Sequence, residues 1–192
     1  MNKKDVADFF DKCAPWWDAD MIRNEKIISA ILDNCGIRAG VDVLDVACGT
    51  GVLFPDYIKR NAASVTGIDI SPEMAKIAER KFPQVTVICG DVEETGFLKQ
   101  FDCVMVYNAL PHFPNPEKLI EILAGLVKKG GRLSVAHGMS RAALHRHHAV
   151  RAGNVSIELI SEDVLAAIFS KWFTVDVIIS NENMYQVAGT RR

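Results

Sequence analysis

The stretch VLDVACGTGVLF, residues 43–54, joins an apolar run to a glycine turn. The apolar run stops at Asp45, and small residues follow from Ala47 to Gly51. Glycines placed after a buried strand let the backbone turn tightly and approach a ligand closely. The stretch therefore predicts a strand, a cofactor-binding turn and the start of a helix.

The composition is that of a globular protein. The chain has 192 residues, of which 49% are hydrophobic and 24% are charged, so it can bury a sizeable core. Its formal net charge of −2 gives no general attraction to nucleic acid or anionic lipid, and we expect neither as a partner. The chain has five cysteines, and its N-terminus turns acidic before any apolar run. No apolar run approaches the roughly 20 residues of a membrane span. These features favour a reduced, cytoplasmic protein.

Short β-rich runs alternate with helical segments after residue 40. The expected strands are residues 41–47, 64–70, 84–90, 101–108 and 131–137, and the expected helices between them are residues 52–61, 72–81 and 116–128. Strands that are nearly continuous in apolar residues and alternate with helices are typical of a parallel sheet covered on both faces.

The C-terminal segment breaks this alternation. A last helix is expected over residues 161–172, and the strands 173–180 and 184–191 follow it. Residues 181–183 are too few to hold a crossover helix, so these two strands must be antiparallel. The predicted fold is an α/β, Rossmann-like, doubly wound sheet of seven strands. Five of them are parallel and a C-terminal pair is antiparallel, with helices on both faces.

We expect a single domain over residues 1–192. Its expected parts are an N-terminal helical cap (1–38), a cofactor-binding core (39–137), a substrate-side insertion (138–160), and a C-terminal helix with the strand pair (161–192).

The glycine turn departs from two nucleotide-binding patterns. A dinucleotide fingerprint would have a third glycine where Phe54 stands. A phosphate-binding loop would have Lys-Ser or Lys-Thr after the glycines, and none follows here. Both patterns are therefore disfavoured.

Three carboxylates stand at the ends of successive strands: Asp45, Asp69 and Asp91. An acid placed like Asp69 can accept hydrogen bonds from ribose hydroxyls. Asp91 could accept from an adenine amine, and Asp45 could favour a ligand cation directly or through water. Clustered negative charge suits an ammonium and a sulfonium and would repel a pyrophosphate. These residues point to S-adenosylmethionine as the cofactor.

The run VLDVACGTG, followed by GIDIS, GDVEE, FDCVMVYNAL and LVKKGGRLSV, resembles the class I S-adenosylmethionine-dependent methyltransferases of the small-molecule type. The resemblance covers residues 40–137 and implies methyl transfer to a small-molecule acceptor. It implies that Ala47, Cys48, Gly49 and Gly51 contact the methionine and ribose parts of the cofactor and that Asp69 contacts the ribose. It implies that Ile70, Met74, Asp91 and the Val92 backbone contact the adenine. Asn108 would lie near the transferred methyl group.

The opening FFDKCAPWWDAD is similar to the N-terminus of the ubiquinone and menaquinone methyltransferases. In those relatives an aromatic residue and an acid close over the cofactor, which implies the same role for Trp17 and Asp18. Trp17 replaces the usual tyrosine and so lacks the hydroxyl that would contact the cofactor carboxylate.

Methyl transfer from a sulfonium is an in-line displacement, for which the protein mainly binds and aligns the reactants. A general base is needed only when the acceptor arrives protonated. His112, after the fourth strand, and His137, at the end of the fifth, have suitable pKa values and placement for that role. With Asn108 they are the candidate catalytic residues.

A histidine-rich segment, HGMSRAALHRHHAV, begins at His137. No CxxC or HExxH pattern accompanies it, so we expect no metal and favour a solvated polar helix. A metal or acidic-substrate site at His145 and His148 stays open as an alternative. Two other functions also stay open: a nicotinamide-dependent oxidoreductase, and a non-catalytic cofactor- or metal-binding module. The acceptor, the methylated atom and the oligomeric state, a homodimer included, are open as well.

Overall fold

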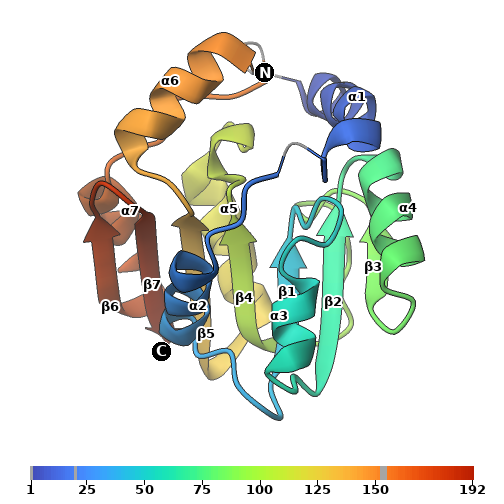
Figure 1. Ribbon diagram of the computed structural model, residues 1–192. Coiled ribbons are helices and arrows are strands. Elements are labelled where there is room, and N and C mark those ends of the chain that lie inside the picture. The colour runs from blue at the N-terminus through green and yellow to red at the C-terminus, as the bar shows by residue number, and fades with distance from the viewer. Residues whose placement is uncertain (1, 20, 152–154) are drawn as a thin grey trace.

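The computed structural model describes residues 2–19, 21–151 and 155–192, and it describes the backbone alone for residues 147–151. Its centre is a seven-stranded sheet in the order β3-β2-β1-β4-β5-β7-β6 (Figure 1). The strands are β1 (Asp42–Val46), β2 (Ser64–Asp69), β3 (Thr86–Cys89), β4 (Phe101–Tyr107), β5 (Val127–His137), β6 (Phe173–Ser180) and β7 (Tyr185–Arg191).

The strand directions confirm the predicted fold. β1 is parallel to β2 and β4, β3 is parallel to β2, and β5 is parallel to β4. β7 is antiparallel to both β5 and β6. Several boundaries differ by a few residues, most clearly at β5, which begins at Val127, inside the helix expected to reach residue 128. Val127 pairs with Phe101 of β4, and this pairing draws the end of that segment into the sheet.

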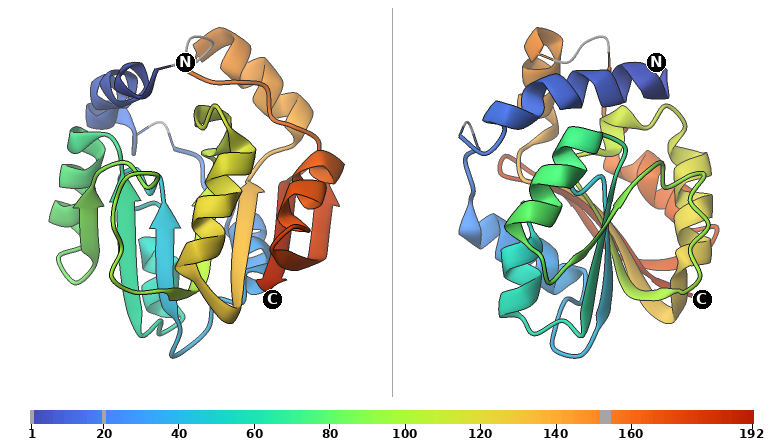
Figure 2. Two further views of the ribbon diagram at one scale, coloured as in Figure 1. Left: turned by 180° about the vertical axis from the view of Figure 1, so that it is seen from behind. Right: turned by 90° about the vertical axis from the view of Figure 1, so that its right-hand side faces the viewer.

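Helices cover both faces of the sheet. α2 (Glu25–Asn34), α3 (Phe54–Lys59) and α4 (Pro72–Lys81) pack on one face, and α5 (Pro116–Leu126) and α7 (Glu162–Phe169) pack on the other (Figure 2). α1 (Lys3–Cys13) and α6 (Arg141–Arg151) lie across the carboxyl ends of the parallel strands (Figure 1). Within the described ranges, no helix has the length and apolar character needed to cross a bilayer.

The central strand β1 is buried on both faces, as its apolar sequence predicts. Val43 packs against α2 and α3, and Leu44 packs against the helices of the opposite face. Successive side chains of a strand point to opposite faces, so one short strand joins both halves of the core. The start of α4 is set by Ser71, whose hydroxyl accepts a hydrogen bond from the Met74 amide at 3.1 Å.

Phe54 occupies the position where a dinucleotide fingerprint would have its third glycine. Its ring is fully buried and packs against β2 at Gly67. A Cβ on Gly67 would lie 2.5 Å from Phe54 Cζ and 2.8 Å from Cys48 Sγ. The small residue therefore lies on the strand and the large one on the helix, which reverses the arrangement around a pyrophosphate.

We expect Gly67→Ala to lower the free energy of unfolding by about 1–3 kcal/mol, because overpacking a filled core costs that much. The matched control is Gly125→Ala on the exposed side of α5, where an added Cβ would meet nothing within 4 Å. Alanine there should raise stability by about 0.5–1 kcal/mol. Urea unfolding of both variants measures the two effects. Equal stability of the Gly67→Ala and wild-type proteins would contradict the tight packing of Phe54.

Candidate active site

A cavity of about 670 Å³ opens at the carboxyl ends of β1, β2 and β4, under α1. Its walls are mostly apolar. The predicted site residues that line it are Trp17, Ala47, Cys48, Gly49, Asp69, Ile70, Met74, Asp91, Val92, Asn108 and His112. These residues lie far apart in the sequence, and the parallel sheet brings them to one edge, as expected for a doubly wound fold.

Asp45 and Gly51 are not among the residues that line the cavity, so their cofactor contacts, which for Asp45 could be direct or through water, stay predictions. Asp45 is still inside β1, and its side chain is buried under α3, close to the Tyr57 hydroxyl. Burial raises the pKa of Asp45 to about 8, although Tyr57 acts to lower it. Gly51 shapes the turn instead: its φ is +81°, and the Phe54 ring fills the space beside it.

His137 is also not among the residues that line the cavity, and its role as a candidate base stays a prediction. It is the last residue of β5 and is fully buried, because its neighbour in the sheet is Tyr185 of β7. The two rings lie edge to face with centroids 5.9 Å apart. The His137 imidazole therefore packs within the fold.

Asp69 connects the glycine turn to the end of β2. Its carboxylate accepts hydrogen bonds from the Gly49 amide at 2.7 Å and from the Ser71 amide at 2.8 Å. Burial raises the pKa of Asp69 to about 6, although these two amides act to lower it. Each carboxylate oxygen has a second lone pair, so Asp69 can also accept from ligand hydroxyls in the cavity.

Tyr107, at the end of β4, is a cavity residue that the sequence reasoning missed. Asn108 follows it with a φ of +54°, and the Asn108 side-chain oxygen accepts from the Gly138 amide at 2.9 Å. The Asn108 side chain also lies beside the Tyr107 hydroxyl. Burial raises the pKa of Tyr107, although Asn108 and the charge of Arg23 act to lower it. The hydroxyl therefore stays protonated and can donate a hydrogen bond.

Gly138 leaves room for this arrangement. A Cβ there would lie 2.4 Å from the Tyr107 hydroxyl oxygen. A signal was present in the sequence, because an aromatic hydroxyl directly precedes Asn108 at a strand end.

His112 ends the short 3₁₀ helix Leu110–His112 and lines the cavity. Its Nδ1 lies 2.7 Å from the Val155 carbonyl oxygen. A carbonyl only accepts, so Nδ1 carries the proton and Nε2 holds the lone pair of the neutral ring. Burial lowers the pKa of His112, although the Val155 hydrogen bond acts to raise it. The ring is therefore neutral at physiological pH.

The N-terminal segment, residues 3–18, is attached to the loops that follow β1, β2 and β3. The contacts are a Lys3–Asp91 ion pair, a hydrogen bond from Ser71 Oγ to Asp11 at 2.5 Å, and a hydrogen bond from Thr50 Oγ1 to Asp18 at 2.6 Å. The segment thus covers the cavity and holds the loops that shape it.

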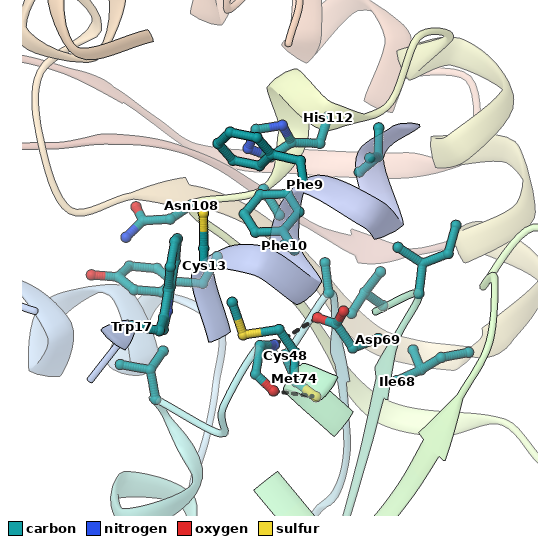
Figure 3. Close-up of a pocket in the computed structure, with 18 of the residues that line it drawn as sticks. Phe9, Phe10, Cys13, Trp17, Cys48, Ile68, Asp69, Met74, Asn108 and His112 are labelled. Carbon is teal, nitrogen blue, oxygen red and sulfur yellow. Dashed lines mark hydrogen bonds between the residues drawn. The ribbon is translucent and has the colours of Figure 1, made fainter. Parts of the chain in front are cut away.

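Aromatic rings of this segment form the roof of the cavity. The Phe10 ring lies between Trp17 and His112 (Figure 3), with centroid distances of 5.6 Å and 4.9 Å and edge-to-face geometry. Trp17 Nε1 lies 3.8 Å from the position that a Cβ on Gly49 would take. Trp17 therefore lies over the glycine turn. Phe10 was not singled out in the sequence, because its ring contacts come from distant segments.

The histidine-rich segment lies mainly in α6. His145 is mostly exposed and is 3.9 Å from the carboxylate of Glu158. The side chains of His147 and His148 lie outside the described residues. Among the side chains that the structure describes, no three or more His, Cys, Asp or Glu residues are grouped as metal ligands would be. Met139 and Leu144, from the expected substrate-side insertion, line the cavity.

Comparison with known proteins shows which family the chain resembles. Residues 43–131 match the model of a family described as "Methyltransferase domain", and this range holds the glycine turn, Asp69, Asp91 and His112. In this range the chain is similar to the class I S-adenosylmethionine-dependent methyltransferases. S-adenosylmethionine is the cofactor of this family. The comparisons give no support to the nicotinamide alternative or to a non-catalytic module.

Curated relatives and solved structures agree with this family. The chain is 29% identical over 143 residues to a ubiquinone biosynthesis O-methyltransferase of Coxiella burnetii, covering 69% of this chain and 61% of that protein. It is 37% identical over 131 residues to one of Xanthomonas oryzae pv. oryzae, covering 62% and 54%. The chain thus spans about three fifths or less of these relatives. The fold matches the magnesium protoporphyrin IX methyltransferase of Synechocystis PCC 6803 with a TM-score of 0.74, 20% identity and 100% coverage of both chains.

The pKa of Asp69 predicts how cofactor affinity depends on pH. Protonation below about pH 6 removes the negative charge that would accept the ribose hydroxyls, so the affinity for S-adenosylhomocysteine should fall by up to tenfold per pH unit there. Above that pH the affinity should level off. Calorimetric titration across the range measures this. The control, Asp69→Asn, should bind weakly and with little pH dependence. A wild-type affinity that does not change across this range would contradict the prediction.

Proposed function

We propose that the chain transfers a methyl group from S-adenosylmethionine to an apolar small-molecule acceptor by in-line displacement. The observation that carries this proposal is the two-ended cavity. One end has the carboxylates of Asp69 and Asp91, and the other is bounded by apolar side chains such as Phe113, Met139 and Leu144. A polar, cationic cofactor fits the first end, and an apolar acceptor fits the second.

The residues at the acidic end fit the cofactor. Asp69 would accept the ribose hydroxyls, and Asp91 with the Val92 backbone would read the adenine edge. Ile70 and Met74 would pack against the adenine ring. The turn at Ala47, Cys48 and Gly49 leaves space for the ribose and methionine parts beneath Trp17. When bound, S-adenosylmethionine supplies the sulfonium methyl group, and these residues hold it in position.

Tyr107 supplies a hydroxyl where Trp17 lacks one. Tyr107 and Arg23 line the same cavity, and the charge of Arg23 reaches the Tyr107 hydroxyl. Arg23 is held in place by Glu25 at 2.9 Å and Asp56 at 2.7 Å. The Tyr107 hydroxyl would donate a hydrogen bond to the cofactor carboxylate, and Arg23 would add positive charge nearby.

The acceptor end suits a hydroxyl on an apolar, ring-containing molecule. Its walls are apolar, and the curated relatives are named as O-methyltransferases. A hydroxyl becomes a better nucleophile as its proton leaves, and His112 presents a neutral imidazole to the cavity. We assign His112 the role of general base, and Asn108 would lie near the transferred methyl group. A net charge of −2 and a cavity of about 670 Å³ favour a small molecule over nucleic acid.

The function is tested by cofactor titration followed by methyl transfer from labelled S-adenosylmethionine to a panel of apolar phenols. S-adenosylhomocysteine should bind and NADH should not. His112→Ala should leave cofactor affinity within about twofold and lower kcat by roughly 10²–10⁴, the usual contribution of a general base. The control, His145→Ala, changes an exposed α6 residue and should keep full turnover. NADH binding without S-adenosylhomocysteine binding would overturn the function; unchanged kcat in His112→Ala would overturn only the base assignment.

The role of Tyr107 is tested with two ligands that differ in the carboxylate. Tyr107→Phe should weaken S-adenosylhomocysteine binding by roughly tenfold or more, because a hydrogen bond to a charged group contributes about 1.5–3 kcal/mol. The same variant should bind 5′-methylthioadenosine like the wild type, since that ligand lacks the amino acid part. Equal losses for both ligands would mean that Tyr107 shapes the cavity rather than binding the carboxylate.

A further inference from the structure

Two cysteines, Cys35 and Cys103, lie side by side away from the cofactor cavity, toward the amino end of β4. Cys35 caps the C-terminus of α2, and Cys103 is in β4. Cys35 Sγ is 3.8 Å from the Val104 carbonyl oxygen, and Cys103 Sγ is 3.6 Å from the Gly36 carbonyl oxygen. Each sulfur thus contacts the residue that follows the other cysteine, so the two thiols are neighbours.

A second, smaller pocket of about 210 Å³ reaches Cys103. Basic side chains surround it: Arg38, Lys128, Lys129 and Arg132. A water molecule takes up about 30 Å³ in the liquid, so the pocket can admit a small molecule such as a hydroperoxide. Cys103 is 2% exposed and therefore buried, but it lies at the wall of a pocket that a small reagent can enter.

The two thiols differ in their tendency to ionise. The neighbouring Cys35 thiol lowers the pKa of Cys103, and Arg38 and Arg132 act in the same direction, against burial and Asp102. The neighbouring Cys103 thiol and complete burial raise the pKa of Cys35. Cys103, beside the basic pocket, is thus the member that ionises more readily. Thiolates, not thiols, react with peroxides.

We propose that Cys103 is a modification site for small hydroperoxides and that Cys35 converts its oxidised form into an intramolecular disulfide. The Cys103 thiolate attacks one peroxide oxygen: an S–O bond forms, the O–O bond breaks, and the other oxygen leaves as an alcohol or water after taking up a proton. Cys103 is oxidised by two electrons to a sulfenic acid, and the peroxide is reduced.

The second step uses the thiol beside it. Cys35 attacks the Cys103 sulfur, an S–S bond forms, and the S–O bond breaks. The hydroxyl leaves as water with the Cys35 proton. A small thiol reduces this disulfide by exchange.

Exposure alone predicts a different reactive residue. Cys89 is the exposed cysteine among those that the structure describes, and Cys13 is partly exposed. Burial raises the pKa of both thiols, and Asp69 and Asp11 raise that of Cys89 further. Their surroundings thus favour the unreactive thiol. The order in which the cysteines are oxidised therefore distinguishes a specific site at Cys103 from oxidation of whichever cysteine is most exposed.

The test treats the folded full chain with hydrogen peroxide, blocks free thiols and maps the peptides by mass spectrometry. The Cys35–Cys103 disulfide should form before Cys89 or Cys13 is oxidised, and dithiothreitol should reverse it. In Cys35→Ser, dimedone should label Cys103, which has lost its partner. In Cys103→Ser, Cys35 should stay unmodified because it is buried. Arg38→Gln is the matched control: it should slow oxidation of Cys103 several-fold and leave that of Cys89 unchanged.

Prior oxidation of Cys89 or Cys13 in the wild-type chain would overturn the proposal. So would a Cys35–Cys103 linkage that forms only in urea. The wild-type peptide map decides both points without a variant, so a substitution that disturbs folding does not obscure the answer.

Discussion

The hydrogen bond from the Gly49 amide to the Asp69 carboxylate is the interaction on which the active site depends. It connects the turn after β1 to the end of β2, so that two parallel strands act as one rim of the cavity. The turn uses positive φ angles at Ala47 and Gly49, and the Gly49 amide points toward β2 rather than along a helix. A buried amide without a partner would cost about 1–3 kcal/mol. Asp69 therefore shapes the site before it meets any ligand.

The strand directions and most residues that line the cavity were predictable from the sequence, because local patterns determine them. The side that a strand-end residue faces was harder to predict, as Asn108 and His137 show. Asn108 lies one residue beyond β4, and its φ of +54° turns it toward the cavity. His137 is still inside β5, paired with Tyr185, and stays within the sheet. If a strand ends one residue earlier or later, its last side chain can line the cavity or pack inside the sheet.

The residues of the N-terminal segment do not by themselves show where it packs, although the family resemblance implied that Trp17 and Asp18 close over the cofactor. Its helix shows an amphipathic pattern, which predicts a buried face but not the surface that buries it. The contacts that orient it join residues far apart in the chain, such as Lys3 with Asp91 and Asp18 with Thr50. They depend on three loops that become neighbours only after the sheet has formed. The same limit explains why the ring contacts of Phe10 were not foreseen.

The roof formed by these contacts must both close over bound ligands and open to exchange them. In the proposed function, the rings of Phe10 and Trp17 would keep water from the reacting atoms when the roof is closed, which would strengthen electrostatic interactions inside the cavity. Open, the roof must let ligands exchange. The ion pair between Lys3 and Asp91 is partly exposed, and such pairs contribute only about 0–1 kcal/mol each. Because Asp91 also lies at the proposed adenine site, closure of the roof and recognition of the cofactor depend on the same carboxylate.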